Sequence, residues 1–180
     1  MLEQSNRFLS PREIVEQFGI NSNCYVADFG SGAGDFAIAI AELVSPKGKV
    51  YAIDVLESAH QSLRSRYKIK GITNIELILA NLECDSGSNL PKESLDLVML
   101  HNIMFQVSNK KKLIQEAYRV LKENGRLAVI EWNMISLIGP PKNLRLPERE
   151  VLSLIQNNGF SIEHRVDAGR YHYGYVFNKL

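Results

Sequence analysis

The feature of the sequence that most constrains the fold is an apolar, strand-like run that leads through a glycine-rich loop into a helix-like run. The segment reads VADFGSGAGDFAIAIAEL, from Val26 to Leu43. Its three glycines at alternate positions can adopt backbone angles that other residues avoid, and they let the main chain approach a ligand closely. A loop of this kind between a strand and a helix predicts a binding site at the start of the helix.

Strand-like and helix-like runs alternate along the rest of the chain. Apolar strands, each followed by a helix, predict a mostly parallel sheet with helices on both faces. Strands are expected at 24–29, 49–55, 75–81, 94–102 and 126–132, and a hairpin from residue 160 onward closes the chain. Helices are expected at 35–44, 57–71, 109–125 and 146–159, after a short first helix that starts with the capping-box residues Ser10 and Glu13 and ends near Gly19.

A chain of 180 residues is expected to form one domain, spanning 1–180. Residues 1–22 are expected to be an N-terminal helical segment. The stretch 133–145 is long for a connection between two elements, and loops of that length are more often functional than idle. We therefore expect 133–145 to form a lid loop over the binding site.

Composition excludes several classes of function. A net charge of +1 argues against nucleic acid as a partner, and we interpret the basic run Lys110 to Lys112 as a solvated helix face. Two separated cysteines, Cys24 and Cys84, predict neither a disulfide framework nor a metal site. The N-terminal residues MLEQSNRFLSPRE contain no signal-like apolar core, and no apolar run approaches a membrane span. We expect a cytoplasmic protein.

The charges around the glycine loop indicate which ligand it binds. The spacing is GxGxG rather than the GxGxxG of dinucleotide sites, which disfavours an NAD-dependent oxidoreductase. Asp28 and Asp35 flank the loop and would repel a pyrophosphate, but they suit a cationic ligand. Asp54 ends the second strand, where a carboxylate accepts hydrogen bonds from ribose hydroxyls. A nucleoside with a cationic, amino-acid-like tail fits this pattern, and S-adenosylmethionine is such a molecule.

Each of these residues also has a purely structural interpretation. The glycines could form only a tight turn, Asp35 could be only a helix cap, and Asp54 could be a surface acid. Taken together and in this order, on a strand–loop–helix–strand frame, they favour a nucleotide-type cofactor site.

The sequence resembles the class I S-adenosylmethionine-dependent methyltransferases, especially small bacterial and archaeal proteins related to the ubiquinone/menaquinone C-methyltransferases. The stretches that carry the resemblance run in order from about Arg7 to the C-terminus: VADFGSGAGDF, GKVYAIDV, NIELILANLE, SLDLVMLHNIMFQV, EAYRVLKENGRLAVIEW and HYGYVF. The resemblance implies a Rossmann-like three-layer sandwich whose sheet has seven strands, mostly parallel, with the last strand antiparallel.

The resemblance also implies a cofactor site built from residues that end the first four strands or follow them. These are Asp28, Phe29, Gly30, Ser31, Gly32, Gly34, Asp54, Val55, Asn81, Leu82, Glu83, His101 and Asn102. Asn81 stands where the family usually has an aspartate that binds the adenine amino group. Its side-chain carbonyl can still accept a hydrogen bond.

Methyl transfer from a sulfonium is an in-line displacement, in which alignment of the acceptor and exclusion of water matter most. His101 is the first candidate for a general base or for acceptor positioning, and His172 is the second. Both could instead be hydrogen-bonded structural residues. Trp132, near the same edge, could be a pocket wall or a core residue.

We expect an S-adenosylmethionine-dependent methyltransferase that acts on an unidentified acceptor, most simply a small molecule. Two isolated cysteines do not supply the thiols of arsenite methylation, and the motifs that hold magnesium in catechol methylation or an extruded base are missing. The alternative function is a module that binds S-adenosylmethionine without turnover, as a sensor or an assembly partner. The sequence does not indicate an oligomeric state.

Overall fold

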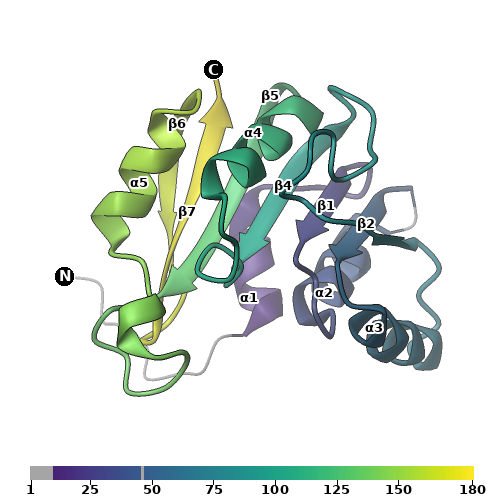
Figure 1. Cartoon of the computed structure of the whole chain (residues 1–180). Coiled ribbons are helices and arrows are strands. Elements are labelled where there is room, and N and C mark those ends of the chain that lie inside the picture. Colours follow the sequence, from purple (N-terminus) through teal and green to yellow (C-terminus); the bar gives the residue numbers. More distant parts are fainter. Residues whose placement is uncertain (1–9, 46) are drawn as a thin grey trace.

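A seven-stranded sheet with the strand order β3-β2-β1-β4-β5-β7-β6 forms the centre of the computed structural model (Figure 1). The structure describes residues 10–45 and 47–180, so the first nine residues of the expected helical segment 1–22 lie outside the described residues. The strands are β1 (Tyr25–Phe29), β2 (Lys49–Asp54), β3 (Ile75–Leu79), β4 (Leu95–His101), β5 (Leu121–Trp132), β6 (Phe160–Val166) and β7 (His172–Lys179).

Strands β1 to β5 are parallel to one another, whereas β7 runs antiparallel to both β5 and β6. Figure 1 shows β7 pointing away from the end of the sheet at which β1, β4 and β5 finish. The predicted α/β fold, with a mostly parallel seven-stranded sheet and an antiparallel last strand, is confirmed.

Helices cover both faces of the sheet, as the apolar strands require. Figure 1 shows α4 and α5 in front of the sheet, with α1 and α2 behind it. A core cluster under α1 and α2 and a second cluster under α4 and α5 fill the two sides. The helices are α1 (Pro11–Val15), α2 (Asp35–Val44), α3 (Glu57–Ile69), α4 (Lys110–Val120) and α5 (Glu148–Gln156), with short 3-10 turns η1 (Glu16–Phe18) and η2 (Lys142–Leu144).

The central strand β1 shows why this architecture suits the sequence. Its last four residues, from Val26 to Phe29, are buried because β2 and β4 pair on its two sides and helices cover its two faces. Helix α2 then covers Asp35 to Val44, the range expected from the sequence. The first helix begins as expected, because the Ser10 hydroxyl accepts a hydrogen bond from the Glu13 N–H.

The helix expected over 109–125 was wrong at its C-terminal end. Helix α4 stops at Val120, and Leu121 already has an extended backbone and pairs with Leu95 of β4. Asn124 then adopts a left-handed conformation with φ of 62°. Pairing with β4 and burial of Leu121 therefore overrode the local helix preference of the segment LKENG.

None of the helices in the described part of the chain has the length and apolar character needed to span a lipid bilayer.

Candidate functional site

The expected site residues meet at one edge of the sheet. Strands β1, β2, β4 and β5 end there with Phe29, Asp54, His101 and Trp132. Strand β7 runs in the opposite direction, so its first residue, His172, reaches the same edge and pairs with Trp132. In an open α/β sheet, this is the edge at which ligands bind.

The glycine loop has two glycines that pack against protein and one that faces open space. Gly30, Gly32 and Gly34 all have positive φ angles, of 76°, 51° and 84°. A Cβ atom at Gly30 would lie 2.5 Å from Ile103, and one at Gly34 would lie 2.1 Å from Leu63. A Cβ atom at Gly32 would meet none of the described atoms within 4 Å. Gly32 therefore marks the place where the loop can approach a ligand.

Asp54 is tied to this open position by its carboxylate. Its Oδ2 atom accepts a hydrogen bond of 2.9 Å from the Gly32 N–H, and its Oδ1 atom accepts one of 3.0 Å from the Leu56 N–H. Each carboxylate oxygen retains a second lone pair for a ligand hydroxyl. Val55, the next residue, is 59% exposed, so an apolar side chain lies open beside the carboxylate.

Asp28 is a buried carboxyl group beneath the loop. Burial raises the pKa of Asp28 to about 7, and the negative charge of Asp54 adds to the effect, while a hydrogen bond from the Ala37 backbone opposes it. A cation bound nearby would favour the ionised form and reverse this shift. The side chain of Phe29, the neighbouring expected residue, is fully buried in the core, so only its backbone can line the loop.

Arg66 of α3 is a residue of the site that the sequence reasoning missed. Its guanidinium donates to Asp35 Oδ1 at 2.6 Å and to the carbonyl of Ala33 at 2.7 Å. Asp35 is thus paired with a cation and largely exposed, and the N-cap position of α2 belongs to Gly34 rather than to Asp35. The negative charge next to the loop in the free protein therefore comes mainly from Asp54. A basic residue late in the helix expected over 57–71 was the only sequence signal for this contact.

The loop after β3 carries Asn81, Leu82 and Glu83. The Asn81 side-chain carbonyl accepts a hydrogen bond from the Glu83 N–H at 3.0 Å, and Leu82 is buried. The Glu83 carboxylate accepts from the Asn109 N–H at 2.6 Å, at the start of α4. Glu83 therefore fixes the loop through its side chain, and Asn81 remains exposed at the edge of the site.

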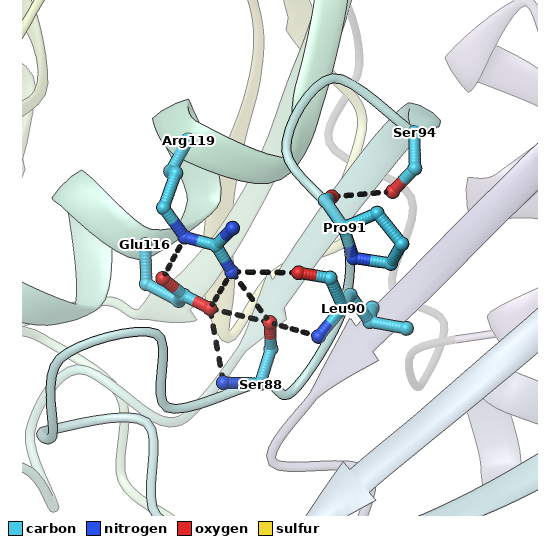
Figure 2. A network of polar contacts seen from close by, with 6 residues as sticks. All are labelled: Ser88, Leu90, Pro91, Ser94, Glu116 and Arg119. Atoms are coloured by element: carbon cyan, nitrogen blue, oxygen red, sulfur yellow. Dashed lines mark hydrogen bonds and ion pairs between the residues drawn. The ribbon is translucent and has the colours of Figure 1, made fainter.

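A buried polar network holds the next part of this loop on α4. Figure 2 shows the carboxylate of Glu116 between Arg119 and Ser88. Glu116 accepts from Arg119 Nε at 2.8 Å, from the Ser88 N–H at 2.9 Å and from the Ser88 hydroxyl, while Arg119 also donates to the Leu90 carbonyl. The hydrogen bonds lower the pKa of Glu116 in spite of its burial. Helix α4 thus anchors the loop that carries Asn81.

Two histidines and one amide form the other side of the site. Asn102 Nδ2 lies 3.0 Å from His101 Nε2 and 3.1 Å from His172 Nε2. The ring of Phe36 lies 4.3 Å from that of His101, and the ring of Trp132 lies 4.0 Å from that of His172, between centroids. The amide and the aromatic rings hold both imidazoles in place.

Both imidazoles are neutral at physiological pH. Burial lowers the pKa of His101 to about 3, and the neighbouring His172 adds to the effect. Burial lowers the pKa of His172 to about 4, with a further contribution from the positive charge of Arg145. A group with so low a pKa is a weak base at pH 7, so these values favour positioning, the second of the two roles expected for His101.

Glu131 near the end of β5 is a second buried carboxyl group. It accepts a hydrogen bond of 2.8 Å from the Met104 N–H, in the turn after Asn102. Burial raises the pKa of Glu131 to about 7, although hydrogen bonds from the backbones of Met104, Ile103 and Trp132 lower it. The carboxyl group therefore links the turn after β4 to β5.

The loop 133–145 is closed on itself by Arg145. This side chain is 8% exposed and donates four hydrogen bonds to backbone carbonyl groups within the loop. A Cβ atom at Gly139 would lie 2.6 Å from the Trp132 ring, so the loop packs on that indole. The carbonyl groups belong to Asn133, Ser136, Ile138 and Pro140. The lid role of 133–145 stays a prediction, but the loop has a defined internal structure.

The residues around the glycine loop fit S-adenosylmethionine. The open position at Gly32 leaves room for a ligand, and the hydroxyl of Ser31 is buried without a hydrogen-bond partner among the described residues. The carboxyl groups of Asp28 and Asp54 match its cationic and hydroxylated parts. Across residues 10–45 and 47–180, no three His, Cys, Asp or Glu side chains gather as metal ligands.

Comparison with known proteins shows the same family along most of the chain. A family model described as a methyltransferase domain matches residues 20–170. A ubiquinone/menaquinone biosynthesis C-methyltransferase of Hydrogenovibrio crunogenus is 33% identical over 126 residues, which cover 69% of this chain and 48% of that protein. Human arsenite methyltransferase is 33% identical over 111 residues, which cover 58% of this chain and 30% of that protein. The chain thus spans about half the length, or less, of these curated relatives.

The fold is also that of a solved methyltransferase. The crystal structure of a SAM-dependent methyltransferase from Aquifex aeolicus has a TM-score of 0.88 and 27% identity, and the alignment covers 96% of this chain and 91% of that one. A putative type 11 methyltransferase from Sulfolobus solfataricus has a TM-score of 0.72 and 25% identity. The motifs, the fold and the matched domain agree, and the chain belongs to the S-adenosylmethionine-dependent methyltransferase family.

Proposed function

We propose that this chain transfers the methyl group of S-adenosylmethionine to a small-molecule acceptor. The observation that carries the proposal is the open position at Gly32, bonded to the Asp54 carboxylate, at the sheet edge where His101 and Asn102 also lie. In this proposal the cofactor rests on the glycine loop, and the acceptor approaches from the side of the two histidines.

Each part of the site has a role in holding the cofactor. Asp54 accepts hydrogen bonds from the ribose hydroxyls, and Asp28 stabilises the positive charge. Exposed Val55 borders the adenine together with the loop that begins at Asn81. His101 and Asn102 lie on the methionine side. When bound, S-adenosylmethionine supplies a methyl group on a positively charged sulfur, which is already activated for displacement.

The protein's own contribution to the reaction is then alignment and exclusion of water. The neutral rings of His101 and His172, held by Asn102, give the acceptor a fixed wall. The loop 133–145 packs on Trp132 beside them and limits the entry of water. An acceptor whose attacking atom is already nucleophilic needs no base in such a site.

The acceptor differs from arsenite in this proposal. The two cysteines are unpaired, Cys24 is buried, and Cys84 is exposed in the loop that α4 anchors, so they do not form a group of thiols at the site. Free cysteines are typical of a reducing compartment, which supports a cytoplasmic location.

Calorimetry and product analysis test the proposal. We expect S-adenosylmethionine and S-adenosylhomocysteine to bind, and NAD not to bind. Asp54→Ala should lose roughly 1–3 kcal/mol of binding free energy, because ribose hydroxyls lose a charged acceptor. Glu76→Ala is the control, since Glu76 is an exposed acid near the start of β3 that pairs with Lys49. Its affinity should equal that of the wild type.

Transfer of labelled methyl groups from the cofactor to a panel of small metabolites tests turnover. A methylated product supports the enzyme. Binding of the cofactor with no product across the panel would support the alternative, a binding module without turnover. Absence of binding by the wild-type protein would overturn both.

A further inference from the structure

The side chain of Asn102 contacts both histidines through one atom. Asn102 Nδ2 lies 3.0 Å from His101 Nε2 and 3.1 Å from His172 Nε2, although 70 residues separate Asn102 from His172. An amide nitrogen carries two hydrogens and donates both, so each ring must offer a lone pair at Nε2. A neutral imidazole with a lone pair at Nε2 carries its proton on Nδ1.

The backbone of Asn102 is held in an uncommon conformation that gives it this reach. Its φ angle is 51°, in the left-handed region where asparagine is one of the few tolerated residues. The side chain of Gln106 donates to the Asn102 carbonyl at 2.7 Å, and the Asn102 N–H donates to the carbonyl of Ile130 at 2.9 Å. The main chain on both sides of the amide is therefore fixed before any ligand binds.

The environment of the amide decides which way round it lies. The Oδ1 atom is buried and has no hydrogen-bond partner among the described residues. Reversing the amide would place its two N–H groups in that position, and buried N–H donors without a partner are rarer than buried carbonyl oxygens without one. The orientation with Nδ2 toward the two rings is therefore favoured.

We propose that Asn102 is a positioning residue that fixes His101 and His172 in the same tautomer, with the proton of each ring on Nδ1. The rings of Phe36 and Trp132, packed at a tilt against the two imidazoles, prevent either one from turning away. The two histidines then act as one unit, because the single amide group of Asn102 determines which nitrogen carries the proton in both rings. Neither Nε2 lone pair is free to take a proton from an acceptor.

This assignment specifies how the site recognises its acceptor, and in that respect it rests on the proposed function. A ligand that hydrogen-bonds to the remaining nitrogen of either ring meets an N–H donor. The acceptor class that suits the site is a molecule with a lone-pair oxygen or nitrogen next to the atom that is methylated.

Nitrogen-15 NMR of the histidine side chains tests the tautomers directly and needs no cofactor or turnover. At pH 7 we expect His101 and His172 to show protonated Nδ1 and unprotonated Nε2. His164 provides a reference for a protonated Nε2 in the same spectrum, because its Nε2 lies 3.0 Å from the carbonyl of Gln17 and must donate to it. Single His→Gln variants assign the signals.

Asn102→Asp tests the role of the amide. Its carboxylate can only accept, so both rings should move to the tautomer with the proton on Nε2, while His164 is unchanged. Asn124→Asp is the matched control, because Asn124 is exposed, has a φ of 62° and lies in β5 well before the site. It should leave all four histidines as in the wild type.

Three results would overturn the assignment: different tautomers on His101 and His172, a proton on Nε2 of both in the wild type, or no change in Asn102→Asp. A methyl-transfer assay separates this failure from failure of the proposed function. If product forms but the tautomers differ from those expected, the proposed function stands and the proposed role of Asn102 is wrong. If the tautomers are as expected but no product forms, the role of Asn102 is supported and the proposed methyl transfer is not.

Discussion

The indole ring of Trp132 and the imidazole ring of His172 lie 4.0 Å apart between centroids, tilted by 38°. They come from the ends of antiparallel strands that pair these two residues directly. The loop after β5 then packs on the same indole at Gly139. Trp132 therefore connects the loop 133–145 to the histidine that faces the site, and it is more than a filler of the core.

The open position at Gly32 leads to the first prediction. Gly32→Val should abolish cofactor binding, with a loss of at least about a hundredfold in affinity, because the side chain would fill the space left for the ligand. The β-branched residue is also strained at a φ of 51°, which should cost about 1–2 kcal/mol of folding free energy. Calorimetry with S-adenosylhomocysteine and urea unfolding measure the two effects.

Gly71→Val is the matched control for that strain. Gly71 has a φ of 68°, and a Cβ atom there would also meet none of the described atoms within 4 Å. This variant should lose similar stability and keep full cofactor affinity. If Gly32→Val binds as tightly as the wild type, the loop is only a turn.

The raised pKa of Asp28 predicts how stability depends on pH. The folded protein holds the proton up to a pKa of about 7, whereas the unfolded chain releases it near the ordinary value of 3.8. The folded state therefore binds more protons between these values, and the free energy of unfolding falls as pH rises through that window. We expect Asp28 to contribute about 2–3 kcal/mol of this fall between pH 5 and pH 7.5.

Urea unfolding of Asp28→Asn at several pH values measures this contribution. The free energy of unfolding of the variant should fall less steeply with pH than that of the wild type. Glu131, whose pKa is also raised to about 7, should account for part of the fall that remains. Asp85→Asn is the control, because its side chain is 95% exposed. Equal slopes for Asp28→Asn and the wild type would show that Asp28 does not titrate in this range.

The hydrogen bonds of Arg145 are expected to keep the loop 133–145 ordered. Arg145→Ala removes four hydrogen bonds to loop carbonyls, so backbone amides of 133–145 should exchange with deuterium at least about tenfold faster, and the protein should lose about 1–3 kcal/mol. Arg145→Lys keeps the charge but cannot reach all four carbonyl groups. Its exchange rates and its stability should therefore lie between those of the wild type and those of Arg145→Ala.

The same exchange experiment tests the lid. In the wild-type protein, exchange in 133–145 should slow further when cofactor and acceptor are bound. Equal exchange in the free and bound protein would identify the loop as a fixed wall instead.

Much of the fold follows from local patterns in the sequence. Helix α2 has the bounds expected from the sequence, because a glycine loop and a proline-containing stop flank a mostly apolar run. The first four strands fall within two residues of expectation at each end, since each is a short apolar run after a turn. The end of α4 could not be predicted in this way, because pairing of Leu121 with β4 decides it.

The site could be predicted only where it depends on strand ends. The parallel order of the strands brings Asp28, Asp54 and His101 to one edge, and the antiparallel β7 adds His172. Contacts between side chains distant in sequence could not be predicted. Arg66 meets Asp35 across 31 residues, and nothing in either local segment predicts the direction of those side chains.

The last prediction concerns the two histidines during methyl transfer. With a pKa of about 3 for His101 and about 4 for His172, and with Nε2 of each within reach of Asn102, neither ring is suited to take a proton at pH 7. We expect His101→Ala and His172→Ala to slow single-turnover methyl transfer by less than about tenfold at saturating cofactor, whereas loss of a general base costs about a hundredfold or more. The pH profile of the wild-type rate should also show no ionisation of a histidine between pH 5 and pH 8. His164→Ala, on β6, is the control. A loss of a hundredfold or more in His101→Ala, with unchanged cofactor affinity, would instead assign His101 as the base and place the proton transfer at that ring.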